Sequence, residues 1–410
     1  MNHVEKTFLE IIKHYVRGNK FEEVSLSAGE INDLLVLSVK QNLLTMVFDA
    51  LSDSNMLDII DRKIKTEWQK RAINIVFRQI IQTNEFLNIL LSCQNKGYDP
   101  VVVKGIICRN IYPSPFTRVS VDEDIVVKKE DMKFIHETLL SEGLHADDEN
   151  ADIQNDYELS YHKKDSPTYI EVHSKLFDPE AEGYSSLNEF FGEEIFDRTE
   201  KILIDDVYVR TLSFTDHFLF LVFHAYKHFI YSGVGIRAVC DIGMFADRYG
   251  DKIDWKYIRE CLEKVNVFYY AKALLNIIRQ YLLPNSDFYK YIPDWNIEEV
   301  DINDMMNDIL DSGALGDSSE DRLHTSNMTL HAVEGHKSNF VLNSLFPSVR
   351  KIKKSYPYLE KAPFLLPVAW IQRIIRYAKD SLSKNKSNAT ASVKLGMERI
   401  ELLKEYKIIK

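Results

Sequence analysis

This chain of 410 residues has few cysteines and lacks any long apolar run. Four cysteines so far apart fit reduced thiols in the core better than a disulfide framework or a zinc knuckle. No apolar run reaches the ~20 residues needed to cross a bilayer, and charges interrupt residues 1–16, which argues against a signal peptide. These absences predict a cytoplasmic protein without a transmembrane segment. The cysteines are Cys93, Cys108, Cys240 and Cys261.

A basic excess is also missing, because 51 lysines and arginines stand against 62 acidic residues, a formal charge of −11. Proteins that coat nucleic acids are normally basic, since their affinity comes largely from neutralising phosphates. We therefore expect no long nucleic acid as a partner. No internal repeat is visible either.

Hydrophobic periodicity predicts a central α/β unit with helical segments on both sides. Residues 98–212 alternate like short strands, including two hairpins, among short helical stretches. Residues 1–97 and 213–285 have helical spacing and capping-box patterns. Residues 286–340 are acidic and predict a peripheral insertion with little regular order, and residues 341–410 predict a C-terminal helical segment. The expected fold class is α+β, a small mixed β-sheet core flanked by N-terminal and C-terminal helical domains.

Two carboxylates stand side by side in the stretch Arg118-Val-Ser-Val-Asp122-Glu-Asp124-Ile-Val-Val. Residues i and i+2 of a strand face the same side, so Asp122 and Asp124 are predicted to project together. Unpaired carboxylates at the end of a buried strand are costly unless something offsets their charge. The pattern favours a divalent cation over simple solvation.

A working two-metal site usually takes a third acid from a neighbouring strand. Glu171 is the candidate, in the alternating segment Tyr169-Ile-Glu171-Val-His173. A second interpretation is open, in which Glu171 lies on the solvated face of the sheet and Ile170 and Val172 face the core.

A strand-turn-helix pattern at Val103-Lys104-Gly105 precedes the paired acids. Glycine lets backbone amides approach a phosphate closely, and the start of a helix adds positive potential. Lys104 would add a cation for the same phosphates. Taken alone, a Lys-Gly pair is weak evidence.

These motifs together resemble the bacterial uncharacterised nucleotidyltransferase family. That family belongs to the nucleotidyltransferase-fold superfamily, shared with DNA polymerase beta and the aminoglycoside-modifying nucleotidyltransferases. The resemblance covers roughly residues 60–280 and a C-terminal patch, and the individually loose motifs recur in order. The matching motifs are Val-Lys104-Gly105, Tyr112-Pro113, Arg118, Asp122-x-Asp124, Ile170-Glu171-Val-His173, His224-x-x-Lys-His228, Gly235-Ile-Arg237-x-x-x-Asp241, Ile253-Asp254-Trp255 and Leu365-Leu-Pro367-x-x-Trp370-x-x-Arg373.

The resemblance implies a nucleotidyltransferase-like core in which Asp122 and Asp124 bind Mg²⁺ (or Mn²⁺) and Glu171 is the third carboxylate. It implies that an acceptor hydroxyl or phosphate attacks the α-phosphate of a nucleoside triphosphate and releases pyrophosphate. Metal ions would neutralise the phosphates, and Glu171 would help deprotonate the acceptor. The usual Gly-Ser turn of the superfamily is Lys104-Gly105 here, so the turn has no serine hydroxyl for a phosphate oxygen.

Other candidate residues have two interpretations each. Arg118 either neutralises triphosphate charge or pairs with an acid, and Arg237 either contacts substrate or pairs with Asp241 along a helix face. His173 shares the predicted face of Glu171 and is a candidate contact for the acceptor or metal. One further pair, His224 and His228, has metal-ligand spacing, but its aromatic neighbours favour core or supporting histidines.

Two questions about partners remain open at this level. The alternative to the enzyme is a non-catalytic binding or scaffold protein that keeps the fold, and a link to surface-polysaccharide assembly is one form of this alternative. Residues 357–376 are apolar with interspersed basic residues and follow a basic run that begins at Arg350. Such a segment contacts either a membrane surface or the protein's own helical domain, and its three prolines favour the second. The acceptor is not encoded in any motif.

Overall fold

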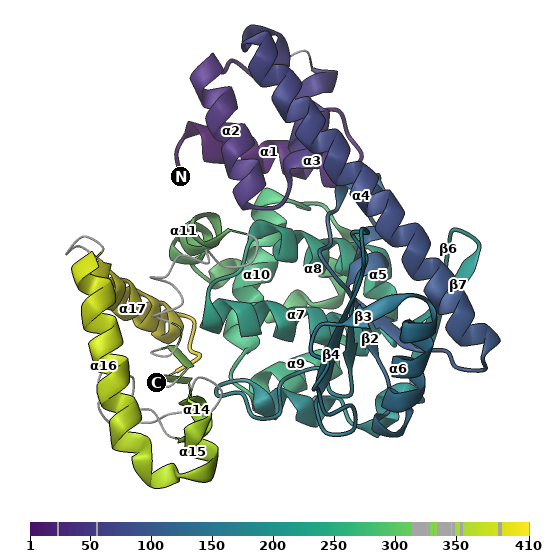
Figure 1. Cartoon of the computed structure of the whole chain (residues 1–410). Helices are drawn as coiled ribbons and strands as arrows, with labels where there is room; N and C mark the ends of the chain where they lie inside the picture. Colours follow the sequence, from purple (N-terminus) through teal and green to yellow (C-terminus); the bar gives the residue numbers. More distant parts are fainter. Residues whose placement is uncertain are drawn as a thin grey trace.

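The computed structural model confirms the α+β class, with a mixed seven-stranded sheet among many helices (Figure 1). It describes residues 1–313 apart from 23 and 55, and then residues 326, 329–330, 332–333, 346, 349–352, 356–383 and 388–409. Within these residues no helix has the length and apolar content to cross a bilayer. All four cysteines are buried free thiols, as the sequence predicts.

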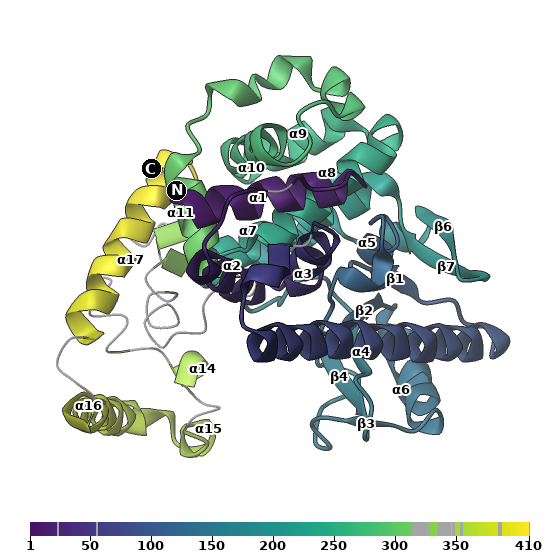
Figure 2. The same ribbon diagram turned by 90° about the horizontal axis from the view of Figure 1, so that it is seen from above.

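The N-terminal helices form a layer that a single long helix ties to the sheet. Helices α1 (His3–Val16) and α2 (Ala28–Lys40) each begin with a capping box, at Asn2 and Ser27. They pack with α3 (Leu44–Asp53) and the short η1 (Met56–Ile59). Helix α4 (Arg62–Asn95) then runs for 34 residues from this layer down one face of the sheet (Figures 1 and 2).

The sheet has the strand order β3-β4-β5-β2-β1-β7-β6. Its centre is β2, which pairs with β1 in antiparallel and with β5 in parallel orientation. Both predicted hairpins are present, β4 with β5 and β6 with β7. The strands are β1 (Val101–Val103), β2 (Glu123–Val126), β3 (Leu144–Ala146), β4 (Glu158–Lys163), β5 (Tyr169–His173), β6 (Thr199–Ile204) and β7 (Val207–Leu212).

Helices cover both faces of the sheet. Helix α6 (Met132–Ser141) lies with α4 on one side, and α7 (Phe214–Tyr231) and α8 (Ile236–Tyr249) lie on the other (Figures 1 and 2). Helix α7 is buried almost throughout because its apolar residues occur on every side of the helix. The remaining elements of this region are α5 (Gly105–Arg109), η2 (Pro115–Thr117), η3 (Lys129–Asp131), η4 (Ser185–Phe190), η5 (Glu193–Phe196), η6 (Gly250–Lys252), α9 (Trp255–Lys264) and α10 (Phe268–Tyr281).

The expectation of little regular order after residue 285 is wrong for the part that the structure describes up to residue 313. This part forms η7 (Asp287–Tyr291), η8 (Pro293–Trp295), η9 (Ile297–Glu299) and α11 (Asn303–Ser312). Its apolar side chains join the main hydrophobic core, while its acids are exposed, apart from the half-buried Asp308. Most of residues 314–340 lie outside the described residues.

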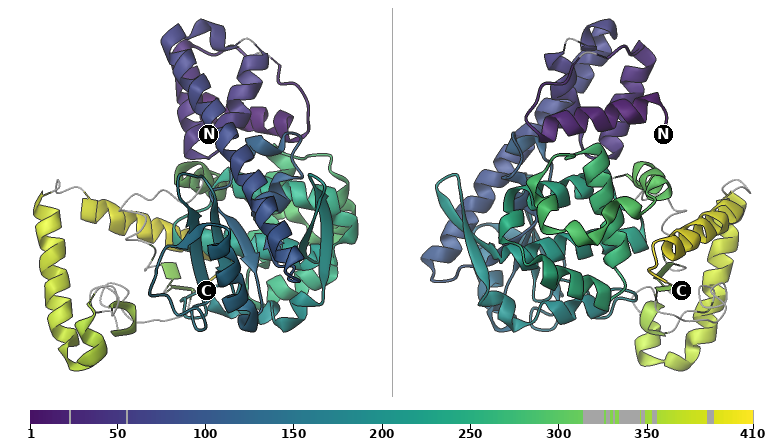
Figure 3. Two further views of the ribbon diagram at one scale, coloured as in Figure 1. Left: turned by 45° about the vertical axis from the view of Figure 1, so that its right-hand side comes forward. Right: turned by 180° about the vertical axis from the view of Figure 1, so that it is seen from behind.

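The C-terminal segment divides into two parts. Helix α17 (Asn388–Glu405) and the residues after it return to the main core, where the Tyr406 hydroxyl donates to the carbonyl of Asp301 over 3.0 Å. The preceding elements pack in a small cluster of their own, at the edge of the molecule (Figure 3). They are α14 (Val349–Ile352), α15 (Tyr358–Lys361), η10 (Pro363–Leu365) and α16 (Leu366–Ser383).

Candidate functional site

A cavity of about 400 Å³ lies beside the central strands, with α7 and α8 on its other side. This volume falls in the ~300–1,000 Å³ range of small-molecule sites. Every residue that the sequence nominates for the site lines this one cavity. They are Lys104, Gly105, Arg118, Asp122, Asp124, Glu171, His173 and Arg237.

Strand register brings the acidic residues together. Asp124 on β2 lies directly opposite Val103 on β1 and Glu171 on β5. Because β2 and β5 are parallel and in register, Asp124 and Glu171 project from the same face. Glu171 therefore faces the cavity while Ile170 and Val172 are buried on the other side.

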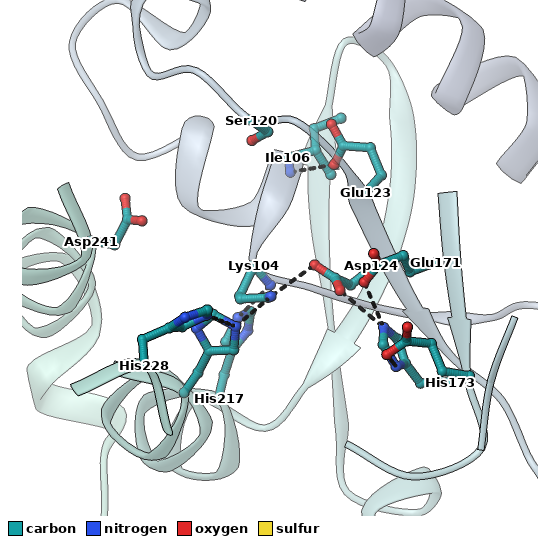
Figure 4. Close-up of polar contacts among 12 residues, drawn as sticks. Lys104, Ile106, Ser120, Glu123, Asp124, Glu171, His173, His217, His228 and Asp241 are labelled. Atoms are coloured by element: carbon teal, nitrogen blue, oxygen red, sulfur yellow. Dashed lines mark hydrogen bonds and ion pairs between the residues drawn. The ribbon is translucent and has the colours of Figure 1, made fainter. Parts of the chain in front are cut away.

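His173 completes a compact group with these two acids (Figure 4). Its Nε2 lies 3.0 Å from Oδ1 of Asp124 and 3.6 Å from Oε2 of Glu171. One ligand atom from each of the three residues lies within 4.8 Å of the others. Asp122, just before β2, lines the same cavity, and burial together with the nearby Asp124 charge raises its pKa.

Lys104 projects into this acidic group from the turn after β1. Its Nζ lies 3.1 Å from Oδ2 of Asp124 and 2.9 Å from Nε2 of His224. The backbone of Lys104 has φ of 50°, a region in which residues other than glycine are uncommon. Its backbone N–H donates to Nε2 of His217 over 3.1 Å. The unusual turn is thus held by specific contacts that aim the ammonium group at Asp124.

The charged groups in the cavity shift the pKa values of one another strongly. Burial alone would raise the pKa of Asp124, but Lys104 and His173 outweigh it and lower that pKa. Burial would lower the pKa of His173, yet hydrogen bonds to Asp124 and Glu171 raise it to about 9. Burial likewise opposes the charge of Lys104, but Asp124 and Asp122 together raise its pKa. The site therefore holds closely opposed full charges.

Three histidines on α7 behave as neutral supports of Lys104. Burial, reinforced by the Lys104 charge, lowers the pKa of His217 to about 3 and that of His224 well below its usual range. Since Nε2 of His217 accepts from Lys104, its Nδ1 carries the proton and donates to Oγ1 of Thr211 over 3.0 Å. His228 lies 3.3 Å from His224, Nε2 to Nε2. These contacts agree with supporting roles for His224 and His228.

Glu123 is a buried acid that the sequence analysis missed. It projects from β2 on the side opposite Asp124 (Figure 4). Its Oε1 lies 2.6 Å from NH2 of Arg109. Its Oε2 accepts the N–H of Ile106, the second residue of α5, over 2.7 Å. A Cβ on Gly105 would lie 2.2 Å from this oxygen, so glycine is required there by the close approach of Glu123. Strand alternation gives the one available clue, because it sends the middle acid of Asp-Glu-Asp to the other face.

Arg118 pairs with an acid from the opposite half of the cavity. Its NH2 and Nε lie 2.5 Å and 3.1 Å from the two carboxylate oxygens of Asp241, which also accepts from the Tyr112 hydroxyl over 2.8 Å. The interpretation of Arg237 and Asp241 as an ion pair along a helix face is therefore wrong. Arg237 instead donates to the carbonyl of Val119 over 2.5 Å.

The comparison with protein families decides the membership of the chain. The model of the uncharacterised nucleotidyltransferase family matches residues 27–282, which is more than half of the chain. The chain belongs to this family. No curated protein and no solved structure matches it.

For a nucleotidyltransferase the basic residues of the cavity have an evident use. Lys227 and Arg237 both line it, and burial lowers the pKa of each. Among the described residues, no acid lies within ion-pair distance of either side chain, whereas Lys104 and Arg118 have Asp124 and Asp241 as partners. The sequence analysis missed Lys227 as a site residue, and its position in the motif His224-x-x-Lys-His228 is the one signal for it.

The acidic group also fits a divalent cation. Asp124 is 3% exposed, and its Oδ2 has no hydrogen-bond partner, although the Lys104 ammonium lies at ion-pair distance without hydrogen-bond alignment. Carboxylate oxygens are the ligands that Mg²⁺ and Mn²⁺ prefer, and an imidazole nitrogen is tolerated by Mn²⁺ and its heavier neighbours.

Proposed function

We propose that this protein is a metal-dependent nucleotidyltransferase that transfers a nucleoside monophosphate from a nucleoside triphosphate to an acceptor. The observation that carries the proposal is the convergence of Asp122, Asp124 and Glu171 on one cavity that also contains Lys227 and Arg237. Acids for cations and cations for phosphates within one cavity are the arrangement that phosphoryl transfer requires. Family membership supports the same reaction class.

In this proposal Asp122, Asp124 and Glu171 would hold Mg²⁺ or Mn²⁺. The metal would neutralise phosphate charge and lower the pKa of the acceptor group. Glu171, whose side chain is 24% exposed against 4% for Asp124, faces the cavity and would be placed to accept the acceptor's proton. Lys227 and Arg237 would bind phosphate oxygens, and Arg118 would position the loop before β2 through Asp241.

Lys104 has two tasks in this scheme. Without substrate its ammonium group neutralises Asp124, and with a triphosphate present it would turn to the phosphates. Amides of the turn are less available, because those of Lys104 and Ile106 already donate to His217 and Glu123. The side chain of Lys104 would thus replace the contact that a Gly-Ser turn supplies elsewhere in the superfamily.

A second candidate function is a non-catalytic binding protein with the same fold. The same turn favours it, since the ammonium group of Lys104 lies where a cation on Asp124 would be held. Such a protein would bind nucleotide without transferring it.

Pyrophosphate release with Mg²⁺ or Mn²⁺ and each nucleoside triphosphate, across hydroxyl and phosphate acceptors, separates the two functions. The enzyme should release pyrophosphate, and Asp122→Asn with Asp124→Asn should abolish release, by at least about 10³-fold. Asp251→Asn, an exposed acid outside the cavity, is the matched control and should change nothing. Nucleotide binding without release with any acceptor would favour the binding protein, and absence of both would reject the proposal.

A further inference from the structure

Four large apolar side chains beside the start of α16 lie exposed on one line. Phe364, Val368, Ile371 and Ile375 are 79%, 43%, 58% and 50% exposed. Their spacing of four, three and four residues places them on the same side of a helix. Isolated exposed apolar residues are ordinary, but an aligned stripe of this kind marks an interaction surface.

The opposite side of the segment already has its packing partners. Ala369 is fully buried and, with Trp370 and Leu366, packs against Leu359 and Ile352. Within the described chain this cluster is separate from the main core. Figures 1 and 3 place α16 at the periphery, away from the sheet. The preferred expectation, that this segment docks on the protein's own helical domain, is therefore wrong for the described residues.

The sequence around the stripe is strongly basic although the chain is acidic. Residues 349–386 contain ten lysines and arginines against two acids, while the whole chain has a formal charge of −11. Two copies of such a segment would repel each other, so charge disfavours self-association through this surface. Anionic lipid headgroups complement the charge of this segment, because each basic residue near the membrane surface contributes favourable binding free energy.

We propose that η10 and α16 bind the surface of an anionic lipid bilayer. The four aligned side chains would enter the boundary between headgroups and acyl chains, and the basic residues of 349–386 would interact with anionic lipids. A cationic helix with one apolar stripe lies in the plane of the membrane surface. That mode agrees with the finding that no described helix could span a bilayer. The exposed side chains form a line with basic residues around it, which fits a lipid surface better than the pocketed surface of a protein partner.

Co-sedimentation of the full chain with vesicles tests the proposal directly. The chain should pellet with vesicles of phosphatidylcholine mixed with phosphatidylglycerol, much less with phosphatidylcholine alone, and less at high salt. Ile371→Ser with Ile375→Ser should lower the partition coefficient by about tenfold or more. These residues are exposed, so the melting temperature of this variant should match that of the unchanged chain.

Ile73→Ser with Phe77→Ser is the matched control, because these two residues of α4 are 58% and 62% exposed. The control should keep full vesicle binding. Failure to pellet with anionic vesicles, or equal loss in both variants, would overturn the proposal. Sedimentation velocity in the same buffers tests whether a second copy of the chain binds this surface instead. A dimer that is lost in the α16 variant and kept in the control would make the surface an interface between copies and would overturn the proposal. No outcome depends on nucleotidyl transfer, so this proposal and the proposed function fail separately.

Discussion

Three buried residues determine how the site is held, and none of them is a nominated metal ligand. Glu123 with Arg109 fixes the turn from behind β2, and His217 fixes it from α7. The contact of His217 with Lys104 joins residues far apart in the sequence, and Glu123 lies between two other acids. Local sequence patterns therefore do not reveal either contact. The nominated residues themselves could be read from strand alternation and the family motifs.

Glu123→Gln is expected to destabilise the fold by roughly 3–5 kcal/mol, because it leaves the Arg109 guanidinium buried without a counter-charge. Urea denaturation at neutral pH measures this loss in the free energy of unfolding. The exposed pair of Lys133 and Glu137 is the control, and Glu137→Gln should leave stability unchanged. Equal stability of the two variants would show that the buried pair is unimportant.

Lys104→Met should tighten Mn²⁺ binding in the absence of nucleotide by about tenfold, since it removes the ammonium group that competes for Asp124. The same variant should weaken binding of a triphosphate, because it loses a phosphate contact. Calorimetric titration with Mn²⁺, with and without ATP, measures both. Weaker Mn²⁺ binding without nucleotide would contradict the competition.

Acidification should destabilise the fold through His217. Its pKa in the folded protein is about 3, below that of an unfolded histidine, so the unfolded chain binds more protons between these values. Its stabilising contribution is present above pH ~6.5 and is lost as pH falls, by about 1–2 kcal/mol between pH 7 and pH 5. Denaturation at both pH values should show a smaller difference for His217→Gln. An unchanged difference would mean that His217 has the same pKa in the folded and the unfolded chain.

At the scale of elements, alternation and capping patterns predicted most of the structure. The strands β1, β2, β4 and β5 and the hairpin of β6 and β7 lie where the alternation predicts them. Residues 287–312 were misjudged because their acids dominate composition, whereas Met305, Met306 and Ile309 have helical spacing and are buried. Pairing between distant elements, such as Arg118 with Asp241, has no local pattern and could not be predicted.

A glycine in the turn of the β6 and β7 hairpin is expected to stabilise the fold. Asp205 and Asp206 both have positive φ, 44° and 66°, the conformation of a type I′ turn that favours glycine at its second position. Asp206→Gly should raise stability by up to about 1 kcal/mol. Thermal denaturation measures it, and lower stability would show that the Asp206 side chain has an unrecognised contact.

At the scale of the whole molecule, one hydrophobic core extends from Phe8 to Ile408 among the described residues, and the small cluster of α14, α15 and α16 stands apart from it. The main core holds the sheet, α7 and α8 rigidly around the cavity, which suits a site whose charges must meet within a few ångströms. The separate cluster suits attachment to another surface. The proposed catalytic and membrane-binding functions would thus lie on different parts of the chain.

The most direct test of the central claim is the electron paramagnetic resonance spectrum of Mn²⁺ titrated into the protein with a non-hydrolysable triphosphate analogue. We expect saturable Mn²⁺ binding that Asp124→Asn abolishes and Asp251→Asn preserves. Unchanged binding of Mn²⁺ and the analogue in Asp124→Asn would contradict the claim that Asp124 holds the metal.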